Sequence, residues 1–262
     1  MIYAICIGRD GSRGFPLKNT HKINDMPLMA YPIQAALNSK YVDEVYFSTE
    51  SRKLKYVAEK YGAIVIDRPK ELATDEALSD DVWVHAYEWI MENGSINTYG
   101  DDIALGDDTI RELKKRNIEF ALLMFANSPC VNGWMIDEMI EILRKDDYAD
   151  SICTVSKYNM YSPARMRKFK TDIGKEIYIE PYKLELAEAS TCDRDSVDDC
   201  YIYDCSCCVV KPKCIEEMEN GMPPQKWLGN NIIGYKQSIP TFDIDFEWQL
   251  GALQYWIDRN WY

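Results

Sequence analysis

The sequence has no run of eighteen apolar residues, so none of its 262 residues predicts a membrane span. Basic residues are scarce beside acidic ones: 30 Lys and Arg face 43 Asp and Glu, a formal net charge of −13. A surface of that sign repels nucleic acid, because non-specific affinity for nucleic acid comes from neutralising its phosphates. Charged residues appear early, at Arg9 and Asp10, so we expect no signal peptide and a cytoplasmic protein.

Two familiar phosphate-binding patterns are also missing. There is no Gly-x-x-x-x-Gly-Lys-Ser/Thr of a P-loop and no Gly-x-Gly-x-x-Gly of a dinucleotide-binding fold. Cysteine is plentiful, but its spacing between Cys192 and Cys214 is irregular, and the pair Cys205 and Cys208 has no second C-x-x-C at zinc-ribbon spacing. We therefore expect free, mostly buried thiols, with a structural zinc as the alternative.

Glycine and basic residues are concentrated in the first loop. The apolar residues 2–7 predict a buried strand that runs directly into this loop. Glycines let backbone N–H groups face inward, and a row of such groups cradles an anion. Arg9, Arg13 and Lys18 add positive charge in an otherwise acidic chain. The loop therefore predicts a site for a small polyanion such as a nucleoside triphosphate.

Strand and helix patterns alternate along the chain. Residues 42–48, 63–66, 120–125 and 151–155 predict strands, and residues 51–61, 79–91 and 133–144 predict helices. This alternation predicts an α/β fold, with a mostly parallel sheet that carries helices on both faces. The length suits a single domain, 1–262, with an acidic surface insertion at about 93–117 and a lobe at about 157–199.

Two segments resemble signatures of the acylneuraminate cytidylyltransferases. The first loop is similar to Ala-Arg-Gly-Gly-Ser-Lys-Gly-Ile-Pro-x-Lys-Asn, with Asp10 in place of a glycine and Arg13 in place of a lysine. Residues 68–79 are similar to Arg-Pro-x-x-Leu-Ala-x-Asp-x-Ala-x-Ser, although Asp75 also fits the N-cap of the next helix. The resemblance implies a Rossmann-like nucleotidyltransferase fold that binds CTP. The nucleotide-binding residues that it implies are Gly8, Arg9, Gly11, Ser12, Arg13, Lys18, Asn19, Arg68 and Ser79.

Two carboxylates near the C-terminus are candidate metal ligands. Asp243 and Asp245 point the same way if they end a strand, because side chains alternate along a strand. Magnesium is commonly held by one or two carboxylates together with substrate phosphates. The family's Asp-x-Asp binds Mg²⁺ at this point, so the resemblance implies a catalytic set of Asp243, Asp245, Arg9 and Lys18. A further acidic residue of the family is replaced by Gln249. Alternatively, Asp245 caps a final helix at 246–259.

The acceptor side departs from the family pattern. Phe125 stands where the sialic acid enzymes have a glutamine that contacts the acid sugar, and Asn127 follows it. In the lobe, Arg165, Arg167 and Arg194 are candidates for binding the acceptor's anionic group, or they are solvated charges on a β-arm.

The resemblance implies that CMP passes from CTP to a small anionic acceptor, with release of pyrophosphate, in a homodimer assembled through the lobe. A nonulosonic or related acid sugar is the leading acceptor, and a phosphonate is the alternative. A non-catalytic nucleotide-binding protein, or an assembly protein organised by zinc, is a hypothesis of another class, because the cysteine cluster leaves it open.

Overall fold

The structure, a computed structural model, describes the whole chain apart from residues 12–13, 95–117, 171–177, 194, 197 and 262. The described residues form two compact units. The first unit comprises residues 1–154, 204–235 and 241–262, and the second comprises residues 155–203 and 236–240. The insertion expected at about 93–117 lies outside the described residues from residue 95 onward.

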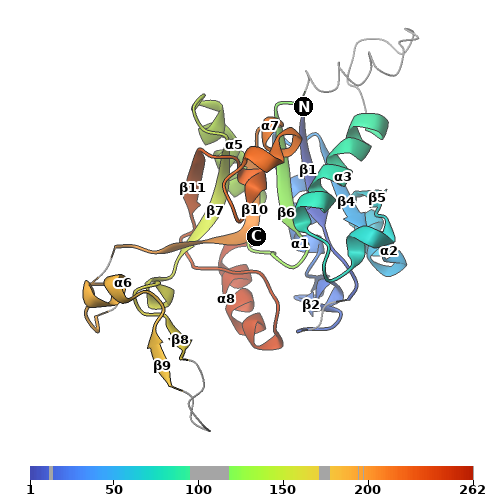
Figure 1. Cartoon of the computed structure of the whole chain (residues 1–262). Helices are drawn as coiled ribbons and strands as arrows, with labels where there is room; N and C mark the ends of the chain where they lie inside the picture. Colours follow the sequence, from blue (N-terminus) through green and yellow to red (C-terminus); the bar gives the residue numbers. More distant parts are fainter. Residues whose placement is uncertain (12–13, 95–117, 171–177, 194, 197, 262) are drawn as a thin grey trace, which may run out of the picture. The chain divides into compact units, whose positions relative to one another are not determined.

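A seven-stranded sheet runs through the described part of the chain, in the order β11-β7-β10-β6-β1-β4-β5 (Figure 1). Its strands are β1 (Ile2–Ile7), β4 (Glu44–Thr49), β5 (Ile64–Asp67), β6 (Phe120–Phe125), β7 (Ser151–Lys157), β10 (Tyr201–Val210) and β11 (Ile232–Lys236). Strand β1 pairs in parallel with β4 and β6, and β4 pairs in parallel with β5. Strand β10 is antiparallel to β6. The predicted α/β class with a mostly parallel sheet is confirmed.

The central strands are apolar because helices cover both faces of the sheet. All six residues of β1 are buried, as expected of a parallel strand with no solvated face. Helix α1 (Ala30–Leu37) packs against α2 (Arg52–Lys60) and α5 (Gly133–Arg144). Helix α3 (Ser79–Asn93) packs against β1 and α7 (Lys213–Glu216), on the near face of the sheet in Figure 1. The last helix of the chain is α8 (Leu250–Asn260).

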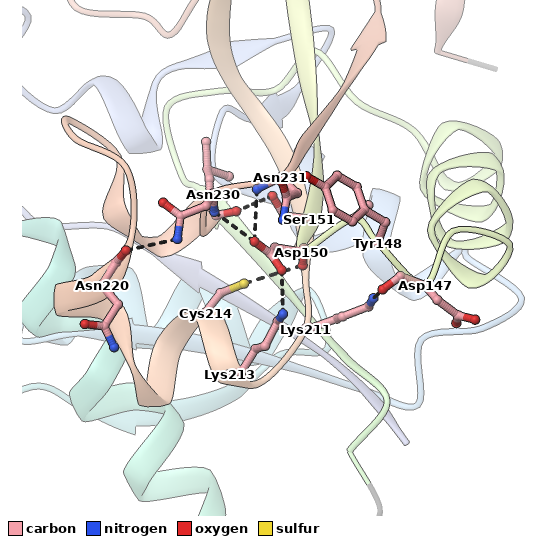
Figure 2. Close-up of polar contacts among 12 residues, drawn as sticks. Asp147, Tyr148, Asp150, Ser151, Lys211, Lys213, Cys214, Asn220, Asn230 and Asn231 are labelled. Atoms are coloured by element: carbon pink, nitrogen blue, oxygen red, sulfur yellow. Dashed lines mark hydrogen bonds and ion pairs between the residues drawn. The ribbon is translucent and has the colours of Figure 1, made fainter.

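A buried carboxylate ties the start of β7 to the turn before β11 (Figure 2). Asp150 Oδ2 accepts the backbone N–H groups of Asn230 and Asn231, each at 2.9 Å, and Oδ1 pairs with Lys213 Nζ at 2.5 Å. At Gly229 the backbone φ is +73°, and a Cβ there would lie 2.7 Å from the Asp150 Cβ. Both facts require glycine at this turn, because other residues strain at positive φ and the space is filled.

The second unit contains a short antiparallel ribbon of β8 (Arg167–Phe169) and β9 (Ile179–Pro181), followed by α6 (Leu184–Glu188). Phe169 and Ile179 are paired across the ribbon and are 72% and 60% exposed. Among the described residues, none of the helices combines the length and the apolar character needed to cross a bilayer.

Candidate functional site

A cavity of about 550 Å³ opens at the carboxyl ends of three parallel strands. Ile7 and Gly8 line it at the end of β1, Arg68 follows β5, and Phe125 and Asn127 lie at the end of β6. The carboxyl ends of parallel strands meet at one edge of the sheet, which is where open α/β sheets bind their ligands. The cavity is therefore the leading candidate for a functional site.

Two glycines bring the first loop close to its neighbours. A Cβ on Gly8 would lie 2.7 Å from the Ala126 Cβ, so the loop leaves β1 through a space that only glycine fits. A Cβ on Gly14 would lie 2.6 Å from the Asp245 backbone oxygen. The N-terminal loop thus runs directly against the C-terminal carboxylate segment, although more than two hundred residues separate them in the sequence.

Asn19 lines the cavity and carries a buried hydrogen-bond acceptor. Its side chain is only 6% exposed, and its Nδ2 donates to the Arg9 carbonyl at 2.9 Å. Its Oδ1 is buried and has no hydrogen-bond partner among the described residues. A buried acceptor of this kind normally finds a partner, so a donor group on a ligand is the chemistry that fits.

The two flexible cations of the cavity each pair with a carboxylate. Arg9 Nη1 lies 2.6 Å from Asp75 Oδ1, and Lys18 Nζ lies 2.6 Å from Asp245 Oδ1. Asp75 is therefore a cavity residue, and the interpretation of Asp75 as a helix N-cap is wrong, because the N-cap of α3 is Leu78.

Arg68 supplies a fixed positive charge in the cavity wall. Its Nε donates to Ser48 Oγ at 3.2 Å, and its Nη2 donates to the Ser48 carbonyl. Burial lowers the pKa of Arg68 to about 10, a shift opposed by the attraction of Glu50 and assisted by the repulsion of Arg9. The guanidinium therefore stays charged at neutral pH, in a poorly solvated place where it attracts an anion strongly.

Asp243 and Asp245 lie in a segment that belongs to no strand. The prediction that their side chains point the same way required a strand, so strand alternation does not support it here. The segment is bound to the end of β6 instead, because Ile244 N donates to the Asn127 carbonyl at 2.8 Å. Burial and the nearby charge of Asp245 raise the pKa of Asp243, while Lys18 and the hydrogen bond from Asn127 act in the opposite direction.

The interpretation of Asp245 as the cap of the final helix is also wrong. A 3₁₀ turn, Glu247–Gln249, precedes α8, and its N-cap is Phe246. The Gln249 side chain accepts the backbone N–H groups of Asp245 and Phe246, each at 2.7 Å. The Asp245 carboxylate pairs with Lys18 and contributes nothing to the cap.

The carboxylate pair fits a magnesium ion. Its donors are carboxylate oxygens, the ligand type that magnesium prefers. No group of three or more His, Cys, Asp or Glu that suits a metal occurs among the described residues. Magnesium does not require one, because phosphates of a bound substrate complete its ligands. Magnesium binding here stays a prediction.

Most of the predicted site residues surround this cavity. Those that line it are Gly8, Arg9, Lys18, Asn19, Arg68, Ser79, Phe125, Asn127 and Asp245. Gly11 lines a small recess beside Arg9 and Lys18, and Asp243 contacts Asn127 without lining the cavity itself. Ser12, Arg13 and Arg194 lie outside the described residues.

Two predicted acceptor-binding residues belong to the second unit. Arg165 Nη1 donates to the Cys192 carbonyl at 3.0 Å, and Arg167 Nη1 donates to the carbonyls of Arg165 and Met166, each at 3.1 Å. Arg165 is half-buried and Arg167 is exposed. Their acceptor role stays a prediction.

Phe125 gives one wall of the cavity an apolar surface. Its ring packs edge-on against the ring of Trp83, with the centroids 5.4 Å apart. A phenyl ring offers no hydrogen bond, so a ligand group beside it gains contact area rather than polar recognition. Leu72 and Val82 also line the cavity with apolar surface, and neither was predicted to do so. The sequence hint for them is their location: Leu72 lies within the segment 68–79, and Val82 lies just after it.

All nine cysteines are free thiols in the structure. Cys207 and Cys208 are fully buried within β10, and burial raises the pKa of Cys207 well above its usual value. Burial also raises the pKa of Cys205. Zinc is bound by the thiolate form, which burial in apolar surroundings disfavours, so these thiols suit core packing.

The chain is similar to several known proteins, and its N-terminal part matches a family model. Residues 3–113 match the family model described as cytidylyltransferase. The N-acylneuraminate cytidylyltransferase of Escherichia coli O18:K1:H7 (strain RS218 / NMEC) is 45% identical over 85 residues, which are 32% of this chain and 20% of that protein. The N-acylneuraminate cytidylyltransferase of Oncorhynchus mykiss is 25% identical over 261 residues, which cover 94% of this chain and 48% of that protein. The chain therefore spans less than half of either relative's length.

A solved structure shares the fold. CMP:2-keto-3-deoxy-manno-octonic acid synthetase, complexed with CTP, superposes with a TM-score of 0.62, at 11% identity and over 98% of both chains. At 11% sequence identity, this structural similarity shows only that the two chains share a fold. The chain is thus similar to N-acylneuraminate cytidylyltransferases, and residues 3–113 match the cytidylyltransferase family model.

Proposed function

We propose that this protein is a CTP-dependent cytidylyltransferase that joins CMP to a small anionic acceptor and releases pyrophosphate. One observation carries the proposal: residues from both ends of the chain, Arg9 and Lys18 in the first loop and Asp245 near the C-terminus, line a single cavity at the carboxyl edge of the sheet. A nucleoside triphosphate needs such a combination, because its phosphates require cations and its reacting centre requires a metal seat.

The base is recognised in this proposal by Asn19, Arg68 and Ser79, which line the cavity. The unpartnered Oδ1 of Asn19 is an acceptor, and its orientation is set by the Nδ2 bond to the Arg9 carbonyl. Cytosine presents an amino donor where uracil-type bases present a carbonyl oxygen. An acceptor held in this way therefore favours CTP over UTP.

The triphosphate is neutralised by Arg9, Lys18 and the amides of the first loop. Lys18 and Arg9 exchange their carboxylate partners for phosphate oxygens when the nucleotide enters. Asp243 and Asp245 would hold a Mg²⁺ ion, which would supply positive charge to the reaction. A bond then forms from the acceptor oxygen to the α-phosphorus as the bond to the leaving pyrophosphate breaks, provided that the two oxygens lie in line.

The acceptor is proposed to be an acid sugar of the nonulosonic class. Two relatives of this chain are named for N-acylneuraminate, which belongs to that class. Phe125 stands in the cavity where the sialic acid enzymes have a glutamine, so an acceptor with an apolar group at that point is favoured. A phosphonate, which also offers an anion, is the second candidate.

We also propose that the protein acts as a homodimer assembled through its second unit. Support comes from the large apolar side chains that this unit exposes, including Phe169 at 72%, Ile179 at 60% and Leu184 at 57%. Exposed apolar area of this density marks a surface that associates with a partner.

A pyrophosphate-release assay tests the proposed reaction. Purified protein is incubated with CTP and MgCl₂ and with single members of a panel of acid sugars and phosphonates, and products are identified by mass spectrometry. We expect acceptor-dependent pyrophosphate release and a CMP-linked product with one acceptor class, and a much lower rate with UTP. Pyrophosphate release at the same rate with and without an acceptor would contradict the proposal. So would a lack of pyrophosphate release with every acceptor in the panel.

A further inference from the structure

The segment that carries Asp243 and Asp245 is held by two carboxamide side chains. From one side, Asn127 Nδ2 donates to Asp243 Oδ2 at 3.3 Å and to the Ile244 carbonyl at 3.1 Å. From the other side, Gln249 accepts the N–H groups of Asp245 and Phe246 at 2.7 Å and donates to the Asp243 carbonyl at 3.3 Å. Asn127 lies at the end of β6 and Gln249 in the turn before α8, so the segment is fastened at two separate elements.

These contacts replace the ladder that a strand would have provided. The segment belongs to no strand, so no backbone ladder fixes its carboxylates. Gln249 is 9% exposed, which makes its bonds less open to exchange with water than those of a surface side chain. The side-chain amide donors of Asn127 are taken up by the segment, which leaves them unavailable to an acceptor molecule.

We infer that Asn127 and Gln249 are positioning residues, which hold the two carboxylates at the separation and orientation that a divalent cation requires. The inference rests on the proposed function, because it assumes the cation at Asp243 and Asp245. It assigns to Asn127 a role in place of direct contact with the acceptor. It also explains why residue 249 carries an amide side chain. The Gln249 side-chain oxygen accepts from two backbone N–H groups, and its NH₂ group donates to a carbonyl, which a carboxylate could not do.

The test measures cation binding directly, with Mn²⁺ as a spectroscopic substitute for Mg²⁺. Free Mn²⁺ is quantified by electron paramagnetic resonance while protein is titrated in the presence of CTP and without an acceptor. The variants are Asn127→Ala, Gln249→Leu and Gln249→Glu, the last of which keeps the acceptor for both backbone N–H groups. Asn132→Ala is the matched control, because Asn132 also makes two hydrogen bonds, to Met135 N and the Asn260 carbonyl, at the start of α5.

We expect Asn127→Ala and Gln249→Leu to raise the Mn²⁺ Kd by about tenfold or more, as changes behind a metal ligand commonly do. The Mn²⁺ Kd of Gln249→Glu should lie between that of Gln249→Leu and that of the wild type. Asn132→Ala should lower the melting temperature without changing the Mn²⁺ Kd. In the pyrophosphate-release assay, Asn127→Ala and Gln249→Leu should need a higher Mg²⁺ concentration than the wild type to reach half-maximal rate.

Different results separate the inference from the proposed function. An unchanged Mn²⁺ Kd in Asn127→Ala and Gln249→Leu, with melting temperatures lowered as in Asn132→Ala, overturns the positioning role alone. Weakened Mn²⁺ binding in a protein that transfers CMP to no acceptor supports the positioning role and overturns the proposed reaction. A wild-type protein that binds no Mn²⁺ with CTP overturns the inference together with the proposed metal site.

Discussion

Two ion pairs set the charge that a nucleotide meets in the cavity. Arg9 pairs with Asp75, and Lys18 pairs with Asp245, so each cation already has a carboxylate partner at 2.6 Å. If the proposed nucleotide binds here, its phosphates compete with these carboxylates. In the proposal, Asp75 is therefore an internal competitor for Arg9, and Asp245 is one for Lys18.

The first prediction concerns the Arg9–Asp75 pair. Arg9→Ala should weaken CTP binding by about tenfold or more, because a hydrogen bond to a charged group contributes roughly 1.5–3 kcal/mol. Asp75→Asn should leave CTP binding unchanged or tighten it, because it removes the competing charge. Calorimetric titration with CTP measures both, with Arg52→Ala on the exposed start of α2 as the control. Unchanged affinity in Arg9→Ala would remove this residue from the site.

A second prediction separates chemistry from stability at Asp245. Asp245→Asn should lower turnover by about a hundredfold or more, because a metal ligand contributes several kcal/mol of charge stabilisation. Its side chain is 52% exposed, so the melting temperature should change little. Glu247→Gln, an exposed neighbour, is the control and should affect neither. Comparable losses of turnover and stability in Asp245→Asn would make the residue structural.

Among the elements, the anchor at Asp150 connects β7, α7 and the turn before β11 (Figure 2). Burial alone would raise the pKa of Asp150, but the bonds from Lys213 and from the Asn230 and Asn231 amides outweigh it and lower this pKa. A depressed carboxyl pKa contributes stability above the unfolded-state pKa, and that stability is lost as the pH falls through the folded-state value.

The third prediction uses this linkage. Asp150→Asn keeps an acceptor for the two amides but loses the charge that pairs with Lys213, so at pH 7 unfolding should require about 1–3 kcal/mol less. The difference from the wild type should begin to shrink below about pH 4, where the unfolded carboxyl takes up a proton, and should vanish only below the lower folded-state pKa of Asp150. Urea unfolding at pH 7 and pH 3 measures it, with the exposed Asp147→Asn as the control. If the wild type and Asp150→Asn differ in unfolding free energy by the same amount at both pH values, the Asp150 charge does not contribute the stability assigned to it.

Regular elements were predictable because their patterns are local. The continuous apolar residues of β1 and β6 predict strands buried on both faces, and the structure confirms them with the same bounds. The segment around Asp243 was not predictable, because its conformation comes from distant partners, Asn127 and Gln249, rather than from its own pattern. Asp75 was interpreted as a cap for the same reason, since its partner Arg9 is remote in the sequence.

At the scale of the whole molecule, the exposed apolar side chains of the second unit lead to the fourth prediction. Multi-angle light scattering should give twice the 30.4 kDa chain mass, because pairing of these surfaces removes apolar area from water. Phe169→Lys, which puts a charge at the most exposed of the ribbon's apolar positions, should shift the mass toward the monomer. Lys170→Glu, a neighbouring exposed charge, serves as the control. A monomeric wild-type protein would defeat the idea.

Local pattern was enough to predict the α/β class and the buried strands, because periodicity acts over a few residues. The common location of Arg9, Lys18, Asn19 and Asp245 follows from the order of strands in the sheet, which brings the carboxyl ends of β1, β5 and β6 to one edge. No stretch of sequence contains that arrangement. Long-range packing creates it, and the contacts made by Asn127, Gln249 and Gly14 hold the C-terminal carboxylates against the N-terminal loop.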